Sequence, residues 1–170
     1  MKMGERVQID HMTVTKNGFT FKQFRSRDRK SKSIHAQIYS NATAKSARKF
    51  LLELVEKSPF KILSIQVDGV SEFMAEFENE CKKFEIPLIV LQPRRPDYNG
   101  GVERGNRIFR EEFYNKNNLL ANNLAEMRPE LEKALWKYNN YRPHHHLNGA
   151  TPMQYILSNN HSRAVSPVVS

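Results

Sequence analysis

The sequence has a single cysteine, Cys81, among 170 residues. One cysteine excludes an internal disulfide framework and a cysteine-based zinc finger, and it fits a reducing compartment. Apolar residues nowhere continue for the ~18 positions that a membrane-spanning helix needs. The opening residues, MKMGERVQID, lack the apolar stretch of a secretory signal. We therefore expect a cytoplasmic protein without a membrane partner.

Acidic residues are also scarce: 18 Asp and Glu stand against 27 Lys and Arg, which gives a net charge of +9. The hydrophobic fraction of 39% and the aromatic fraction of 10% exclude a wholly disordered chain. A chain of this length suits one domain with a real core. Because both signs are mixed along the chain, the charge indicates a globule that faces a nucleic acid. A basic soluble protein without such a partner explains the charge equally well.

Three strands are predicted first. Residues 6–13 alternate between apolar and polar, and Asn17-Gly18 is the strongest short signal for a hairpin. Phe19, Phe21 and Phe24 mark a second strand. A basic turn over residues 25–32 and a third strand over 33–39 follow. This pattern predicts an antiparallel meander.

Helical and strand patterns then alternate, which implies parallel neighbouring strands. The expected helices cover residues 43–57, 72–84, 102–114 and 124–141, and the expected strands cover 62–67 and 87–91. A Pro/Gly-rich loop covers residues 92–101, and Thr151-Pro152 opens a last short helix.

We therefore expect an α/β fold: a mixed five-stranded sheet, with a meander of three strands plus two parallel strands, flanked by helices. One domain should span residues 1–157, with the helices after about residue 115 as its C-terminal extension. Residues 158–170 are polar and should form a flexible tail.

Three acidic residues occur where predicted strands and helices meet. Asp10 lies inside the first strand, where an acid is costly unless it is paired or binds a metal. Asp68 directly follows a strand, and Glu103 opens the helix after the Pro/Gly-rich loop. Such a triple suits two hard cations, with Mg²⁺ the natural choice for phosphoryl transfer. Each acid alone has a structural explanation: a hydrogen-bonded strand Asp, a turn Asp-Gly, and a favourable charge in a first helical turn.

Several motifs point to a family. They are VDGVSEF at 67–73, PRRPDYNGGVER at 93–104 and YNNYRPH at 138–144, followed by Leu147, Thr151 and Pro152. In this order after Asp10, the set resembles the catalytic core of bacterial insertion-sequence transposases and retroviral-type integrases. The resemblance covers residues from about 6 to 157, and it is the combination that is specific.

The resemblance implies an RNase H-like fold with Asp10, Asp68 and Glu103 as the DDE ligands of two Mg²⁺ ions, for which Mn²⁺ substitutes. It implies cleavage at an element end by an activated water, then attack of the freed 3′-hydroxyl on a target phosphodiester, without a covalent protein–DNA intermediate. The implied partners are element-end and target DNA and further copies of the chain, as a dimer or higher oligomer. The implied location is the bacterial cytoplasm, at the nucleoid.

The sequence departs from the family pattern in places. Gly69 and Val70 stand where many relatives have Asn and then Gly, and because Val tolerates positive φ poorly we expect this loop to take a different course. Gln92 and Arg95 stand where Pro and Ser are frequent. The N-terminal helix-turn-helix region expected of a full-length protein is missing before Asp10. We therefore expect weak or no sequence-specific DNA binding from this chain alone, whether it is an excised domain or a natural truncation.

Basic residues near the predicted acids are candidates for phosphate contact. Arg107 and Arg110 follow Glu103 by four and seven positions, which places all three on one face of an α-helix. A solvated basic helix face is the alternative. The full predicted DNA-binding set is Arg94, Arg95, Asn99, Arg107, Arg110 and Arg142.

Other reactive residue types have simpler interpretations. The run His144–His146 lacks the spacing of a zinc site, so we expect a structural or DNA-facing role. His11 should point away from Asp10 on the opposite face of its strand. Cys81 should lie in the core, and Trp136 in the core or in an interface.

Two other functions remain open. A plain RNase H-type nuclease would want a further acid on the first helix, which Glu53 or Glu56 could supply. An inactive truncated transposase would only bind DNA or a full-length partner.

Overall fold

The structure is a computed structural model, and it describes residues 1–68, 74–91, 107 and 109–164. Five strands form one sheet in the order β3-β2-β1-β4-β5. The strands are β1 (Val7–Lys16), β2 (Phe19–Asp28), β3 (Ile34–Tyr39), β4 (Ile65–Asp68) and β5 (Leu88–Leu91). β1, β2 and β3 pair antiparallel, whereas β4 pairs parallel with both β1 and β5. The predicted mixed five-stranded sheet is confirmed.

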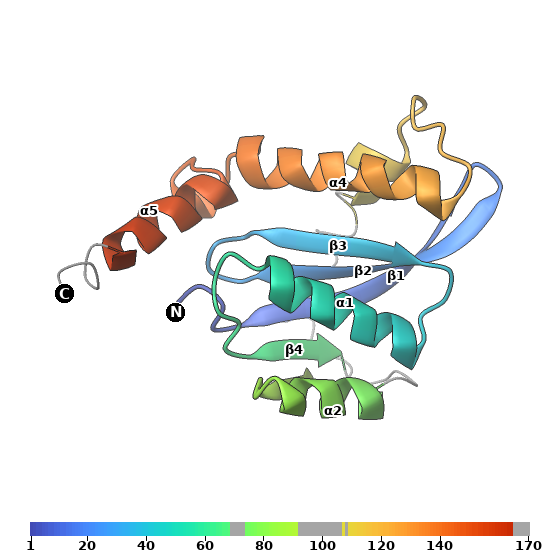
Figure 1. Cartoon of the computed structure of the whole chain (residues 1–170). Coiled ribbons are helices and arrows are strands. Elements are labelled where there is room, and N and C mark those ends of the chain that lie inside the picture. The colour runs from blue at the N-terminus through green and yellow to red at the C-terminus, as the bar shows by residue number, and fades with distance from the viewer. Residues whose placement is uncertain (69–73, 92–106, 108, 165–170) are drawn as a thin grey trace.

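The helices flank this sheet. They are α1 (Ala44–Lys57), α2 (Met74–Lys83), the π-helix η1 (Phe109–Tyr114), α4 (Leu124–Tyr141), the 3₁₀ turn η2 (His145–Leu147) and α5 (Pro152–Ala164). α1 covers one face of the sheet, α4 runs along β3, and α2 lies beside β4 (Figure 1). None of the helices in the described part of the chain is long and apolar enough to cross a membrane.

The two faces of the sheet carry separate cores. On the α1 face, Val7, Ile9 and Phe24 pack with Phe50 and other residues of α1. The opposite face, here called the α4 face, packs side chains of β1, β2 and β3 against η1 and α4. The alternation of side chains along each strand sorts neighbouring residues between the two faces.

Local signals in the sequence explain the first helix. Thr43 caps α1 because its side chain accepts a hydrogen bond from the Ser46 N–H, and Ser58 closes the helix through a bond from its N–H to the Leu54 carbonyl. Pro59, directly after it, cannot continue a helix. The predicted range 43–57 therefore holds to within one residue.

The predicted basic turn over residues 25–32 is wrong in its first half. β2 continues to Asp28, so Arg25 and Arg27 lie in the strand. Asp28 organises the true turn: its carboxylate accepts bonds from the Gly4 N–H at 2.9 Å and from the Ser31 N–H at 2.8 Å. Both arginines therefore lie inside the sheet, because β2 packs between β1 and β3.

The segment predicted as an α-helix over residues 102–114 is a π-helix in its described part, Phe109–Tyr114. The Asn115 N–H bonds to the Arg110 carbonyl, five residues back. Phe109, Phe113 and Tyr114 are all buried, and the wider π turn brings residues four and five apart to the same side.

At the C-terminal end, α5 continues to Ala164, beyond the point where we expected a flexible tail to begin. Asn160 explains the extension, because its side-chain amide donates to the Pro59 carbonyl at 3.2 Å. Ile156, one turn earlier, is 1% exposed. The helix is therefore held to the body of the domain past Ser158.

Candidate metal centre

Asp10 and Asp68 lie side by side at the end of the parallel β1–β4 ladder. The last pair in that ladder is Ile9 with Val67, so the next residue on each strand is an aspartate. Neighbouring strands lie about 4.8 Å apart, which sets the spacing of the two backbones. Ile9 and Val67 face α1, so both carboxylates lie on the α4 face.

The two acids differ in exposure. The Asp10 side chain is 11% exposed, whereas Asp68, the last residue of β4, is exposed. Asp10 therefore lies at the inner wall of the site and Asp68 at its rim. Two carboxylates in register give oxygen donors of the kind that Mg²⁺ prefers, so the residues present fit a divalent cation.

A buried cation accompanies Asp10. Arg25 lies opposite Asp10 in the β1–β2 pairing, and its Nε is 3.4 Å from Asp10 Oδ1. The Arg25 side chain is 3% exposed, and its guanidinium lies 5.9 Å from the centroid of the Phe109 ring. Asp10, the inner acid of the pair, is thus paired with an arginine on the neighbouring strand β2.

Four of the predicted site residues lie outside the described residues: Glu103, Arg94, Arg95 and Asn99. On one side of the undescribed stretch, Leu91 pairs with Asp68. On the other side, the ring of Phe109 packs against the guanidinium of Arg25. Leu91 therefore lies beside Asp68, and Phe109 lies beside the arginine that pairs with Asp10. Among the residues the structure describes, no group of three or more His, Cys, Asp or Glu could hold a metal.

The described basic candidates have different surroundings. Arg107 is exposed, and Arg110, also exposed, donates to the Thr13 carbonyl at 3.4 Å. Arg142 pairs with Glu112, and its guanidinium lies 5.6 Å from the Tyr138 ring centroid. Arg110 therefore lies at the surface near the hairpin end of β1, and Arg107 is exposed. A phosphate would have to compete with Glu112 for Arg142.

His144 and His11 pack against aromatic rings, whereas His145 and His146 are exposed. His144 packs edge-on against Tyr138 at 5.1 Å between ring centroids, and burial, together with nearby Arg142, lowers its pKa to about 4. His11 lies 5.7 Å from the Phe24 ring, away from Asp10, as predicted. Burial also lowers the pKa of His11.

The structure also shows where Cys81 and Trp136 lie. Cys81 is buried in the core beside α1, and burial raises the pKa of its thiol to about 11, so it is a packing residue. Trp136 is 54% exposed and contacts Tyr141 edge-on at 5.0 Å. Of the two alternatives for Trp136, the core is therefore excluded in this chain.

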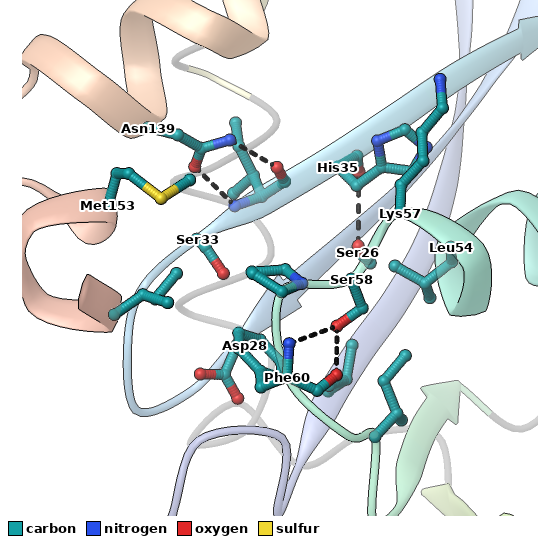
Figure 2. A pocket seen from close by; sticks show the side chains of 15 residues that line it. Ser26, Asp28, Ser33, His35, Leu54, Lys57, Ser58, Phe60, Asn139 and Met153 are labelled. Atoms are coloured by element: carbon teal, nitrogen blue, oxygen red, sulfur yellow. Dashed lines mark hydrogen bonds between the residues drawn. The ribbon is translucent and has the colours of Figure 1, made fainter. Parts of the chain in front are cut away.

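A small cavity of about 140 Å³ lies where the end of β2 meets α1 and α5. Several of its polar groups are bonded within the protein: Ser58 Oγ donates to the Phe60 carbonyl at 2.6 Å, and Asn139 exchanges two bonds with the backbone of Ile34 (Figure 2). The Asp28 carboxylate likewise accepts bonds from Gly4 and Ser31. These bonds join the elements that surround the cavity.

Arg25 is the residue at this site that sequence reasoning missed, although a signal was present. A two-residue turn at Asn17-Gly18 fixes the register of the hairpin, in which Lys16 pairs with Phe19. Counting outward from that turn pairs Asp10 with Arg25. The concentration of charge over residues 25–32 suggested a turn and hid this pairing.

Comparisons with known proteins identify one matching family model and several solved structures of similar fold. Residues 85–152 match the family model described as an integrase core domain. A chain of the simian T-cell lymphotropic virus intasome, in complex with a PP2A regulatory subunit, superimposes with a TM-score of 0.77 at 22% identity, over 90% of this chain and 54% of that one. The HTLV-2 integrase catalytic core domain in complex with magnesium gives 0.69 at 20% identity, over 90% and 95%. The BIV integrase catalytic core domain gives 0.68 at 21% identity, over 95% and 99%.

A search of curated proteins found no match. The chain spans about half the length of the intasome chain but nearly the whole of the isolated catalytic cores. The fold is therefore the RNase H-like fold of integrase catalytic cores, as expected. The resemblance to an integrase or transposase catalytic core is confirmed, by the fold over most of the chain and by the family model over residues 85–152.

Proposed function

We propose that the chain is the catalytic domain of a DNA-integrating or transposing enzyme, with Asp10, Asp68 and Glu103 as the ligands of two Mg²⁺ ions. The observation that carries this proposal is the register of β1 and β4, which sets two carboxylates side by side on one face of the sheet. Mn²⁺ should substitute for Mg²⁺, because both accept carboxylate oxygens.

The reaction proposed is cleavage at an element end followed by transfer of the freed 3′-hydroxyl to a target phosphodiester. When bound, the two ions supply activation of the attacking oxygen and stabilisation of the charge that develops on the phosphate. Asp10 and Asp68 would orient the ions from the sheet. The exposed position of Asp68 would let a DNA backbone approach the site from solvent.

DNA is the proposed partner, and the chain's charge of +9 supports it. Arg107 and Arg110 are proposed to meet phosphates, together with Arg94, Arg95, Asn99 and Arg142. Assembly as a dimer or higher oligomer on paired DNA ends, in the bacterial cytoplasm at the nucleoid, is likewise proposed from the resemblance. Recognition of element ends by an N-terminal helix-turn-helix region stays a prediction.

The nuclease alternative is weaker for a structural reason. Its candidate further acids, Glu53 and Glu56, both lie on α1, and Glu53 accepts bonds from Gln37 at 3.2 Å and Lys57 at 2.9 Å. The His35 ring, which pairs with Glu53 at 3.6 Å, stacks on Phe50 of α1. Glu53 therefore belongs to the α1 face, whereas Asp10 and Asp68 lie on the α4 face.

The proposal is tested with a branched DNA that mimics a strand-transfer product, incubated with Mg²⁺ or Mn²⁺. Reversal of strand transfer passes through the same transition state, and a preformed branch reduces the need for end recognition. Several branch sequences should be tried. The wild type should resolve the branch and rejoin the strand, and Asp68→Asn should not.

The matched control is Glu78→Gln, which changes an exposed acid on α2 that pairs only with Lys82 in the described structure. This variant should act like the wild type. Hydrolysis without rejoining would favour the nuclease. DNA binding without turnover by any variant would favour an inactive transposase remnant.

A further inference from the structure

The feature that the proposed function does not use is the buried arginine beside the inner acid. Arg25 comes from β2, is 2% exposed as a residue, and points its Nε at Asp10 Oδ1 over 3.4 Å. Burying a guanidinium is costly unless a negative group accompanies it. A buried cation in contact with a proposed metal ligand therefore needs an explanation.

Arg25 and a divalent cation would act on the same carboxylate. In the metal-free protein, the guanidinium balances the charge of Asp10 at the inner wall of the site, where only 11% of the acid's side chain is exposed. A bound metal ion would also attract Asp10 and would repel Arg25. The two cations are therefore linked: each weakens the interaction of the other with Asp10.

The packing around Arg25 limits how far it can retreat. Its guanidinium lies 5.9 Å from the ring centroid of Phe109, and Phe109 is itself 5% exposed in the core under α4. On the other side, Ala36 of β3 pairs with Arg25 and is buried. Arg25 therefore has little room to move away from Asp10, and its charge would continue to act on the site with a metal ion bound.

We propose that Arg25 is a positioning residue that holds Asp10 in the metal-free site and lowers the affinity of that site for divalent cations. This inference rests on the proposed function, because it requires Asp10 to be a metal ligand. It goes further by assigning to a β2 residue the control of metal occupancy. As a consequence, the site would need a higher concentration of divalent cations for occupancy than the same site without the Arg25 charge.

The test is the affinity for Mn²⁺, measured by electron paramagnetic resonance or calorimetry on the whole chain. Arg25→Met removes the charge and keeps an unbranched side chain of similar reach. It should bind Mn²⁺ about tenfold more tightly than the wild type, which is the repulsion in water between a divalent and a monovalent cation about 6 Å apart. Arg25→Lys keeps the charge and should stay near the wild-type affinity.

The matched control is Arg27→Met. Arg27 lies two residues along the same strand and on the same face, but it pairs opposite Gln8 and interacts with Tyr138. Its replacement should raise the Mn²⁺ affinity clearly less than Arg25→Met does, because the Arg27 charge lies farther from Asp10. A purely structural Arg25 would change thermal stability in Arg25→Met without raising Mn²⁺ affinity, and that result would overturn the inference.

Two further measurements separate the possible failures. Arg25→Met should melt at a lower temperature than the wild type without metal, and saturating Mn²⁺ should narrow the difference. If that variant does not fold, Arg25→Gln takes its place: it removes the charge, keeps an N–H donor for Asp10, and should also bind Mn²⁺ more tightly than the wild type. Mn²⁺ binding by the wild type with no effect of Arg25 would overturn this inference alone. No Mn²⁺ binding by the wild type would overturn the metal site as well.

Discussion

β1 and β4 present two contrasting faces. Toward α1 they show Val7, Ile9, Ile65 and Val67, which are all buried in one apolar core. Toward the α4 face, the same two strands present the alternate residues, which are Gln8, Asp10, Gln66 and Asp68. The strand residues alternate by one position, so the same backbone builds both surfaces.

The difference separates stability from chemistry. Gln8 and Gln66 are buried but polar, at 7% and 3% exposure, and they lead directly to the two aspartates. A row of polar groups is a poor source of hydrophobic stabilisation and a natural wall for a cation. The α1 face therefore carries the folding free energy of this part of the sheet, and the polar face is free to carry a reactive site.

The largest effect is expected from Asp10→Asn on the polar face. Loss of one carboxylate should lower metal-dependent DNA strand transfer by about 10³-fold or more, because the metals supply several kcal/mol of transition-state stabilisation. The branched-DNA assay measures it. Ile9→Val, the neighbouring residue on the apolar face, should cost only ~1 kcal/mol of stability and leave turnover in place. Equal losses of turnover in both variants would contradict the separation.

The apolar face is tested by Phe50→Ala. Phe50 is 0% exposed and stacks on Phe24 at 5.7 Å and on His35 at 5.7 Å between ring centroids. Its truncation should lower the free energy of unfolding by about 3–5 kcal/mol, measured by urea denaturation. Mn²⁺ affinity of the folded fraction should not change. A stability loss below about 1 kcal/mol would show that this core contributes less than its burial indicates.

A smaller effect is expected from His144, beside the core of the α4 face. Its Nε2 is buried with no hydrogen-bond partner in the described chain, and burial lowers its pKa from 6.5 to about 4. Between these values the unfolded chain binds more protons, so the free energy of unfolding should fall as pH falls from about 6.5 to about 4.

His144→Asn should flatten that pH dependence by about 1–2 kcal/mol, since the ring is only half-buried. Urea denaturation at pH 7 and pH 4.5 measures the change. Replacement of His146, which is exposed and close by, is the control and should leave the slope as it is. A slope that His144→Asn does not alter would place the titrating group elsewhere.

The smallest effect concerns the surface near the polar face. Arg110→Ala should weaken binding to non-specific DNA and reduce the slope of log affinity against log salt by about 1, because one phosphate contact is lost. Lys82→Ala on α2, on the other side of the molecule from the β1–β2 hairpin, should not change the slope (Figure 1). An unchanged slope for Arg110→Ala would remove this residue from the proposed DNA-binding set.

Sequence patterns predicted much of this molecule. The Asn17-Gly18 hairpin, the helical spacing over residues 43–57 and the apolar spacing over 124–141 are local signals, and the structure contains the corresponding hairpin, α1 and α4. The alternation of strand and helix also predicted which strands run parallel. Asp10 and Asp68 could be brought together by this topology before the register was known.

The rest depended on tertiary contacts. Arg25 was assigned to a turn because charge usually marks exposed chain, whereas Asp10 across the strand pair compensates its burial. The π-helix at 109–114 buries Phe109, Phe113 and Tyr114 in one core. The spacing of apolar residues in the sequence does not distinguish this π-helix from an α-helix. α5 extends to Ala164 because Asn160 reaches Pro59, a contact between residues far apart in the chain.

The central claim is that the polar face of β1 and β4 holds a divalent cation between Asp10 and Asp68. Calorimetric titration of the purified chain with Mn²⁺ tests it directly, with Asp10→Asn, Asp68→Asn and the control Glu130→Gln, a half-exposed acid on α4, in parallel. The account predicts saturable binding by the wild type and by Glu130→Gln, and weakening by at least about tenfold in each aspartate variant. Binding that is the same in all four proteins would contradict it.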